Sequence, residues 1–333
     1  MTDTVTMAHG SGGSATKELI ENVFAAEFSN DTLNAMEDSA VVPASEKIAL
    51  TTDSFVVKPV EYKGGNIGRL SICGTVNDLL MRGSKPEYIT AGFILEEGLD
   101  IDLLKRIVKS AAETAREAGV RIVAGDTKVI DGNGGIYINT AGVGLLDPAA
   151  EDISAKRASD GDVIIVSGNL GDHHSAILTD RLGIDSDIES DNAPLVDIVG
   201  NLLKSGVEIH TLRDITRGGL ATVLKELAES SGTCFYINEN DIPASAAVKS
   251  FAAMLGLEPL YMGNEGKLAA VVAAKDVERA LEIIRNSKYG ADAVIVGEVK
   301  AEESRRGRLI VRTEIGSERE VGILKGEGLP RIC

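Results

Sequence analysis

The chain of 333 residues is long enough for about two domains, and its hydrophobic content of 44% is ordinary for a globular protein with a sizeable core. Its formal charge of −17 argues against nucleic-acid binding through bulk electrostatics, and its apolar runs are too short to span a bilayer. No charged and then apolar leader opens the chain, so we expect no secretion signal and no membrane partner.

The first block, residues 1–147, mixes helical and strand-like patterns. The strongest is the helical pattern at 100–118, because Asp100 can cap its N-terminus and Gly119 can stop it. In chain order the predicted elements are helix 16–28, strand 47–57, helix 66–81, strand 87–95, helix 100–118, and strands 120–124 and 136–146.

A linker-like stretch at 147–152 precedes the second block, residues 155–320. The elements predicted there are strand 162–167, helices 193–204, 218–230 and 276–286, and strands 268–273, 293–299 and 309–312. Strands and helices mix without regular βαβ alternation, so the pattern predicts the α+β class and two domains, 1–147 and 155–320. Residues 321–333 are predicted to form a flexible tail.

The tail ends on Cys333, and this position indicates chemistry. The end of a chain is normally its most mobile part, and the twelve residues from Gly322 onward reach roughly 40 Å at ~3.3 Å each when extended. A terminal thiol can therefore travel to chemistry held elsewhere; a frayed end that happens to stop at cysteine is the alternative.

The other two cysteines, Cys73 and Cys234, lie in apolar surroundings and are predicted to be small core residues. The sequence contains no CxxC, which argues against a structural zinc site or a disulfide framework. A reduced, cytoplasmic setting fits this cysteine usage.

Acidic residues recur beside small or hydroxyl residues in several short motifs. Asp53 and Asp126 lie at or near the ends of apolar strands, and Asp78 lies in an apolar helical segment, where an unpaired carboxylate is costly. Each of these residues alone could be a cap or a turn residue. Together they favour a site for Mg²⁺ and a nucleotide, because Mg²⁺ prefers hard oxygen ligands and usually bridges to phosphates.

Glycine-rich turns support this interpretation. Residues 9–13, HGSGG, offer backbone N–H groups to phosphate oxygens, although the segment is not a Walker A sequence. His173, in the turn-like segment 171–174, could transfer a proton or cap a helix, and both readings stay open. Lys128 could neutralise a phosphate and Glu265 could supply a carboxylate, although isolated residues of these types are more often surface charges.

These segments together resemble the HypE family of hydrogenase maturation factors, within the superfamily of ATP-dependent aminoimidazole ribonucleotide synthetase-like proteins. The resemblance covers nearly the whole chain and rests on the segments AHGSGG, TTDSFVV, CGTVNDLLMRG, VAGDTKV, DITRGGLA, NEGK and the PRIC ending. One departure is GDHHS at 171–175, where the family has a GDHG-like turn followed by an apolar residue.

The resemblance implies a homodimer whose N-terminal sheets pair into a shared β-barrel, with a C-terminal α+β domain covering a cleft for ATP and Mg²⁺. It implies dehydration of a carbamoyl group on the terminal cysteine to a thiocyanate, which supplies the cyanide ligand of the iron in nickel–iron hydrogenases. The implied partners are the carbamoyltransferase HypF, as donor, and the HypC–HypD scaffold complex, as acceptor.

The same resemblance suggests a role for each matching residue. Cys333 would carry the carbamoyl group, Lys128 would hold phosphate or the carbamoyl oxygen, and Glu265 would be the base, with His173 as the second choice. The expected Mg²⁺ ligands are Asp38, Asp53, Asp78, Asp126 and Asp214. The expected nucleotide contacts are Gly10, Ser11, Gly12, Gly13, Asp53, Asn77, Asp126 and Thr127.

Two other functions remain open at this point. The first is a small-molecule kinase or synthetase of the same superfamily; a selenophosphate synthetase should carry a reactive cysteine near its N-terminus, whereas the first cysteine here is Cys73. The second is an ATP-binding assembly factor without catalysis, whose tail only docks a partner. A requirement for Cys333 in ATP turnover would separate these possibilities.

Overall fold

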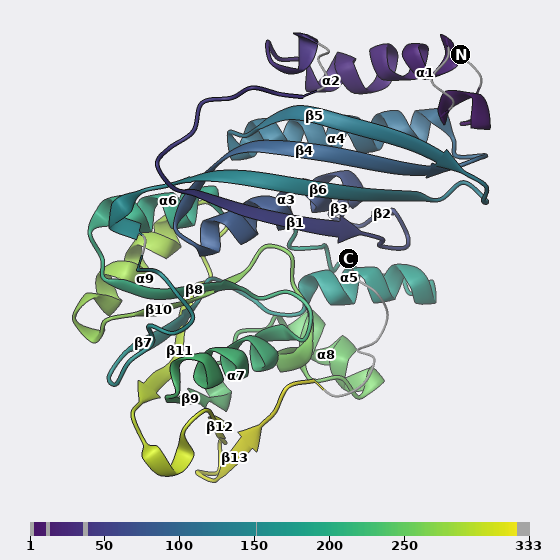
Figure 1. The fold of residues 1–333 in the computed structure, drawn as a ribbon. Coiled ribbons are helices and arrows are strands. Elements are labelled where there is room, and N and C mark those ends of the chain that lie inside the picture. The colour runs from purple at the N-terminus through teal and green to yellow at the C-terminus, as the bar shows by residue number, and fades with distance from the viewer. Residues whose placement is uncertain (1–2, 11–13, 36–38, 151, 325–333) are drawn as a thin grey trace.

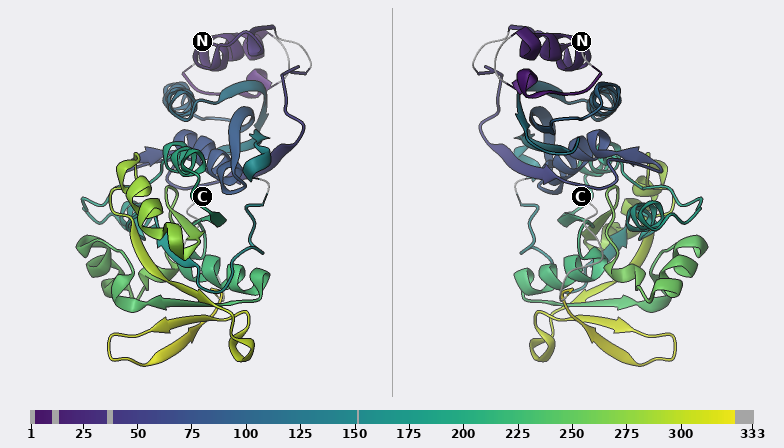
Figure 2. Two further views of the ribbon diagram at one scale, coloured as in Figure 1. Left: turned by 90° about the vertical axis from the view of Figure 1, so that its left-hand side faces the viewer. Right: turned by 90° about the vertical axis from the view of Figure 1, so that its right-hand side faces the viewer.

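The computed structural model describes residues 3–10, 14–35, 39–150 and 152–324. Two halves lie one above the other, each built on its own sheet (Figure 1). Two views from the sides show the same stacking (Figure 2). Both sheets carry helices, so the predicted α+β class is confirmed. In the described part of the chain, no helix is long and apolar enough to cross a membrane.

The N-terminal half contains a four-stranded sheet in the order β1-β6-β4-β5. Its strands are β1 (Ile48–Phe55), β4 (Ser84–Glu96), β5 (Arg121–Ile130) and β6 (Ile136–Leu146). All neighbours are antiparallel except β4 and β5, which are parallel and are joined by helix α4 (Ile101–Ala118). The predicted ends of α4 are confirmed: Asp100 accepts a hydrogen bond from the Leu103 N–H, and Gly119 adopts a left-handed conformation at φ 71°.

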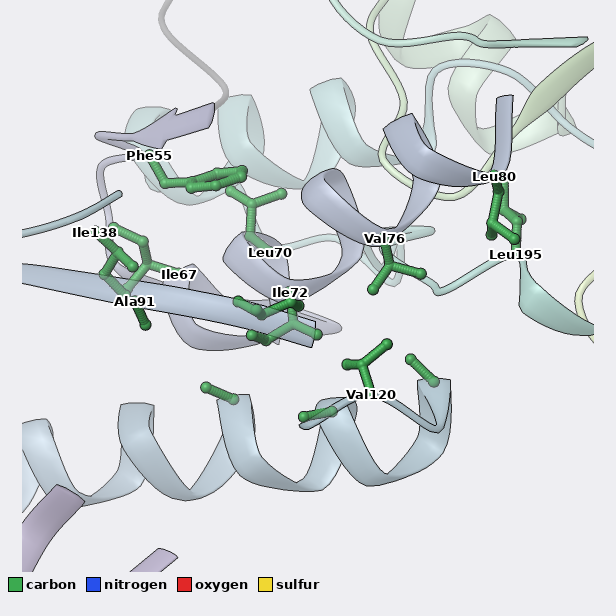
Figure 3. Close-up of a cluster of buried hydrophobic side chains, with 14 of the residues drawn as sticks. Phe55, Ile67, Leu70, Ile72, Val76, Leu80, Ala91, Val120, Ile138 and Leu195 are labelled. Carbon is green, nitrogen blue, oxygen red and sulfur yellow. The ribbon is translucent and has the colours of Figure 1, made fainter. Parts of the chain in front are cut away.

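Helices α3 (Ile67–Met81) and α4 pack on one face of this sheet, behind the strands in Figure 1. Helix α3 is buried on nearly all sides because it lies between the sheet, α4 and the C-terminal half. Figure 3 shows Leu70 and Val76 of α3 in a core that includes Phe55 of β1 and Leu195 of the C-terminal half. The two halves therefore share one continuous apolar core.

No described helix covers the opposite face of the sheet. The alternation along β1 turns Thr51, Asp53 and Phe55 towards α3 and leaves Leu50 and Thr52 exposed on the open face. At the β5 edge lie short N-terminal elements: η1 (Met7–Gly10), α1 (Ser14–Leu19), the π-helical segment η2 (Ile20–Ala25), α2 (Ala26–Phe28) and η3 (Leu33–Ala35). The predicted helix at 16–28 is thus confirmed as a continuous helical run. A small hairpin, β2 (Glu61–Tyr62) and β3 (Gly65–Asn66), precedes α3, and a 3₁₀ turn, η4 (Pro148–Ala150), follows β6.

The C-terminal half contains a seven-stranded sheet in the order β13-β12-β9-β11-β7-β10-β8, in which only β9 and β12 are parallel neighbours. Its strands are β7 (Val163–Val166), β8 (Ile209–Asp214), β9 (Cys234–Asn238), β10 (Leu268–Val272), β11 (Val294–Lys300), β12 (Leu309–Arg312) and β13 (Glu318–Val321). Its helices are α5 (Asp172–Leu182), α6 (Val196–Ser205), α7 (Gly219–Ser231), α8 (Ala246–Leu255) and α9 (Val277–Asn286). Short 3₁₀ turns are η5 (Glu239–Asp241), η6 (Pro259–Tyr261), η7 (Ala274–Asp276) and η8 (Glu303–Arg305).

Several local features differ from the sequence prediction. Strand β5 continues to Ile130, so Asp126 lies inside a strand and not at its end. Residues 171–174 are not a free turn: Gly171, at φ 88°, caps α5, which begins at Asp172. Strands β2, β3, β8, β9 and β13 and helices α5 and α8 were not predicted.

Candidate active site

A cleft of about 640 Å³ separates the two halves. Strand β1 and helix α3 form its upper wall, and the end of β8, the start of α7 and Glu265 form its lower wall. The cleft is therefore built from segments that are far apart in the sequence.

Four of the predicted acidic residues line this cleft: Asp53, Asp78, Asp214 and Glu265. Asp53 comes from β1 and Asp78 from α3, and the Thr51 hydroxyl donates a hydrogen bond to Asp78 Oδ2 at 2.7 Å. Asp214 is the last residue of β8 and pairs with Leu268 at the start of β10, three residues after Glu265. The fold thus gathers four carboxylates that the sequence scatters over more than two hundred positions.

Burial raises the pKa of all four carboxylates, and neighbouring negative charges raise it further for Asp78, Asp214 and Glu265. Burial raises the pKa of Asp53 and of Asp78, and burial together with the charge of Asp78 raises the pKa of Asp214 to about 7. Burial, followed by the charges of Asp191 and Asp214, raises the pKa of Glu265 well above its ordinary value. Carboxylates in such a cluster are stabilised in their charged form by a bound cation.

The donor set fits Mg²⁺ as an open site and not as a closed cage. Within residues 3–10, 14–35, 39–150 and 152–324, no three His, Cys, Asp or Glu side chains are close enough to hold a metal by themselves. Mg²⁺ commonly binds through one or two carboxylates and completes its shell with water and phosphate oxygens. Asp53, Asp78 and Asp214 supply hard oxygen donors of this kind.

Four basic residues that were not predicted as site residues also line this cleft: Arg82, Lys156, Arg213 and Arg217. Arg213 lines the cleft and pairs with Glu226 at 3.1 Å. Arg217 also lines it, and among the described residues no hydrogen bond or ion pair occupies its guanidinium. Arg217 lies within the DITRGGLA segment, and a basic residue followed by two glycines is a pattern that could have identified it as a phosphate-binding residue. Arg213 and Arg217 both suit a phosphate-bearing ligand.

Glu265 is fixed in the cleft wall by its backbone. Its N–H donates to Asp191 Oδ1 at 3.0 Å, and its carbonyl accepts from the Ala193 N–H at 3.2 Å. A Cβ on the next residue, Gly266, would lie 1.9 Å from the Asp191 carbonyl oxygen, so only glycine fits there. Asp191 is a site residue that the sequence analysis did not identify.

Asp126, Thr127, Lys128 and Gly10 do not reach this cleft in a single chain. They line a separate cavity of about 340 Å³ between β5 and the N-terminal helices. Lys128 and Asp126 form an ion pair at 2.7 Å, with 63% and 68% of their side chains exposed. The hydrogen bond from Lys128 lowers the pKa of Asp126. The register of β5 with β4 places this pair on the open face of the sheet.

Asn77 and His173 are both engaged in the fold. The Asn77 amide donates to the Ala193 carbonyl at 3.0 Å and its oxygen accepts from the Leu195 N–H at 2.9 Å, which links α3 to the C-terminal half. His173 is fully buried: its Nδ1 lies 2.7 Å from the Ser190 hydroxyl, and its ring meets Tyr62 edge-on at 5.5 Å. Neither residue lines the cleft, and their proposed roles stay predictions.

His174, the departure noted in the sequence, is buried in the first turn of α5. Its Nδ1 accepts a hydrogen bond from the Gly263 N–H at 3.3 Å. Burial, with a contribution from His173, lowers the pKa of His174 to about 4, so the ring is neutral at ordinary pH. The fold therefore accommodates His174 as an uncharged side chain that contacts the segment before Glu265.

Five predicted site residues lie outside the described residues: Ser11, Gly12, Gly13, Asp38 and Cys333. The start of the tail is described, however, and it lies at the rim of the cleft. The Tyr261 hydroxyl donates to the Gly322 carbonyl at 3.0 Å. The Leu324 N–H donates to the Thr222 hydroxyl at 3.3 Å, and Thr222 itself lines the cleft.

Comparison with known proteins gives consistent matches over the whole chain. Residues 36–146 match the family described as AIR synthase related protein, N-terminal domain, and residues 159–310 match the corresponding C-terminal domain. Carbamoyl dehydratase HypE of Rhodobacter capsulatus is 44% identical over 337 residues, covering 99% of this chain and 98% of the relative.

Two solved structures are similar at the level of the fold. The crystal structure of hydrogenase maturation protein HypE in complex with ATP has a TM-score of 0.95 at 42% identity and covers 99% of this chain and 100% of that chain. A chain in the crystal structure of a HypE–HypF complex has a TM-score of 0.80 at 45% identity and covers 92% of this chain and 99% of that chain.

Proposed function

The chain belongs to the HypE family of carbamoyl dehydratases, which act in hydrogenase maturation, and from that premise we propose that it uses ATP to dehydrate a carbamoyl group carried by Cys333. The product on sulfur would be a thiocyanate, the source of a cyanide ligand for the iron of nickel–iron hydrogenase. The observation that carries the proposal is the cleft itself. The predicted carboxylates Asp53, Asp78, Asp214 and Glu265 line it together with Arg213 and Arg217, and the described start of the tail lies at its rim.

A carbamoyl group has no good leaving group, so its oxygen must be activated before it can be lost. An amide oxygen is a poor leaving group, and transfer of the γ-phosphoryl of ATP to that oxygen makes it a good one. Loss of both N–H protons and of phosphate then leaves C≡N on the sulfur. The balance is thiocarboxamide plus ATP giving thiocyanate, ADP, phosphate and one proton released to solution near neutral pH.

Within the cleft, Arg213 and Arg217 would bind phosphate oxygens, and Glu265 would accept a proton from the carbamoyl nitrogen. Asp53, Asp78 and Asp214 would hold Mg²⁺, which neutralises phosphate charge when it is bound. The thiol of Cys333 must first be loaded as its thiolate, the nucleophilic form of cysteine.

A second copy of the chain would complete this site. The open sheet face exposes Leu50, Ile48, Ile94 and Ile130, and an apolar face without a covering helix favours burial against another copy. Asp126 and Lys128 lie on that same face. The Asp126 and Lys128 of a second copy would therefore reach the cleft only if the two copies pair through this face. In this proposal residues 1–147 form the dimerising domain and residues 155–320 the covering domain.

The partners follow from the reaction. One of the similar solved structures is a complex of HypE with HypF. We therefore propose HypF as the carbamoyl donor for Cys333. We propose the HypC–HypD complex as the cyanide acceptor. A reducing compartment such as the cytoplasm would keep the Cys333 thiol available for this exchange.

The experiment is intact mass spectrometry after incubation with the carbamoyltransferase, carbamoyl phosphate and Mg-ATP. We expect a carbamoyl adduct that maps to Cys333 and then loses the mass of one water when ATP is present. An adduct that never loses water, with no ATP turnover, would favour the noncatalytic assembly factor. ATP hydrolysis with another small molecule and no adduct on Cys333 would favour a synthetase.

A further inference from the structure

A second cavity lies behind Glu265, away from the acidic cleft. Its volume is about 600 Å³, and its walls include Asp172, Asp191, Asn192 and Lys267. Glu265 lines the cleft, whereas Lys267, two residues later, lines this second cavity. The short segment from Glu265 to Lys267 therefore separates the two spaces.

Asp191 connects the two sides of this partition. Its Oδ1 accepts a hydrogen bond from the Glu265 N–H at 3.0 Å, and its Oδ2 lies 3.3 Å from Lys267 Nζ. Only 3% of the Asp191 side chain is exposed. The Asp191 carboxylate is also close enough to Glu265 for its charge to raise the pKa of Glu265. Two buried carboxylates thus lie near each other, one facing each cavity.

The wall of the second cavity holds acceptors that suit ordered water. Asn192 is buried, and its Oδ1 has no hydrogen-bond donor among the described residues. Asp191 Oδ2 likewise lacks a hydrogen bond and has only the ionic contact with Lys267. Buried acceptors of this kind are usually satisfied by water when the space is polar and roomy enough.

Asp172 is a second acidic group on the wall of this cavity, and it is partly exposed. Burial and the charge of Asp191 raise the pKa of Asp172 to about 6, with a further contribution from Asp292 and against the opposing charge of Lys267. The other charged groups on the wall are Arg69, which pairs with Glu117 at 2.8 Å, and Glu113. Because Asp172 is partly exposed, a proton that reaches its carboxylate can pass to solvent.

We propose that Asp191 receives the proton that Glu265 takes from the substrate and passes it through the second cavity to solvent. This inference rests on the proposed function, in which two N–H protons leave the carbamoyl nitrogen. One of them remains with the released phosphate, and the other must reach solution. Glu265 is only 4% exposed, and a nucleotide together with the tail would fill the cleft in front of it. Loss of the proton by this route returns Glu265 to its charged form for the next turnover.

The test is Asp191→Asn in the full-length protein, loaded at Cys333 by the carbamoyltransferase. The amide keeps an oxygen acceptor for the Glu265 N–H but cannot relay a proton. We expect normal loading and normal ATP binding, with single-turnover dehydration slowed by about 100-fold or more. Formate, a carboxylate small enough for the second cavity, should restore much of the rate, and Asp191→Glu should retain more activity than Asp191→Asn.

The matched control is Asp187→Asn, four residues earlier, where the side chain is fully exposed and pairs with Lys63 at 3.2 Å. It should dehydrate at the normal rate and show no response to formate. A normal rate in Asp191→Asn would overturn the proposed exit. A slow rate that formate does not restore would also overturn it, since Asp191 would then only position Glu265. Absence of dehydration in the unaltered protein would instead overturn the proposed function, and this inference with it.

Discussion

The Thr51 hydroxyl donates a hydrogen bond to Asp78 Oδ2 at 2.7 Å and joins β1 to α3 at the wall of the cleft. This bond holds one carboxylate oxygen of Asp78 towards the sheet. Burial raises the pKa of Asp78, and the hydrogen bond from Thr51 opposes this by favouring the charged form.

Asp78→Asn should therefore separate loading from dehydration. The amide keeps the shape and an acceptor for Thr51 but removes the charge that would hold Mg²⁺. We expect normal carbamoylation of Cys333 and a loss of ATP-dependent dehydration of about 100-fold or more, measured by single-turnover intact mass. Asp102→Asn, on the exposed side of α4, is the control. Normal dehydration by Asp78→Asn would show that Asp78 is not a metal ligand.

Cys333→Ala should abolish loading without affecting the fold. Cys73 and Cys234 are both buried, and burial raises the pKa of each thiol, so neither should compete as a nucleophile. We expect no carbamoyl adduct, with unchanged ATP binding and unchanged thermal unfolding. Mild alkylation of the native, unaltered protein should label one thiol and the variant none. An adduct on Cys333→Ala would place the carrier elsewhere.

Leu50→Asp should disrupt self-association through the open sheet face. Leu50 is 69% exposed in the single chain, and a charge there would be costly to bury against a second copy. We expect a shift from dimer to monomer in analytical ultracentrifugation and a parallel fall in ATP turnover. Ile315→Asp, at an even more exposed position between β12 and β13, should remain dimeric. A dimeric Leu50→Asp would argue for a different interface.

Glu117 should make the stability of the protein depend on pH below neutrality. It joins α4 to α3 through a hydrogen bond from Arg69, and α4 to the C-terminal half through hydrogen bonds from Lys288 and Tyr289. Burial alone would raise the pKa of Glu117, but these bonds outweigh it and lower the pKa to about 2. Since the unfolded value is about 4.3, this stabilisation is complete above that value and is lost as pH falls towards 2.

The measurement is urea unfolding of Glu117→Gln and the unaltered protein between pH 7 and pH 3.5. At pH 7 the variant should be less stable by about 1–3 kcal/mol, and the difference should shrink as the pH falls. Glu113→Gln, one turn earlier on α4, should show no such convergence. A constant difference across the range would mean that the Glu117 charge does not contribute.

The sequence predicted correctly the features that short local patterns determine, and it also identified most of the acidic residues of the cleft. The caps at Asp100 and Gly119 fixed the limits of α4, and Asp53, Asp78, Asp214 and Glu265 do meet in one cleft. Their convergence could be anticipated from the resemblance, since no single motif shows which face of a strand or helix meets which partner.

The remaining site features depend on register and packing. Lys128 and Asp126 lie on the open face because β5 runs past its apolar segment in register with β4, which a five-residue strand pattern could not show. Asp191 lies in a segment without regular structure, and only its contact with the Glu265 backbone gives it a role. Arg213 reaches the cleft because β8 pairs with β10, a strand more than fifty residues later.

Under the proposed function, the bonds from Tyr261 to Gly322 and from Leu324 to Thr222 also limit how far Cys333 could travel from the cleft. The nine residues from Lys325 to Cys333 span at most roughly 30 Å from a pivot at the mouth of the cleft, at ~3.3 Å each. A flexible connection of this length would give the Cys333 thiol an effective concentration of about millimolar or more at the cleft. Under the proposed function, the dehydration step then needs no affinity for a diffusing substrate, and its rate responds to the length of this connection instead of carrier concentration.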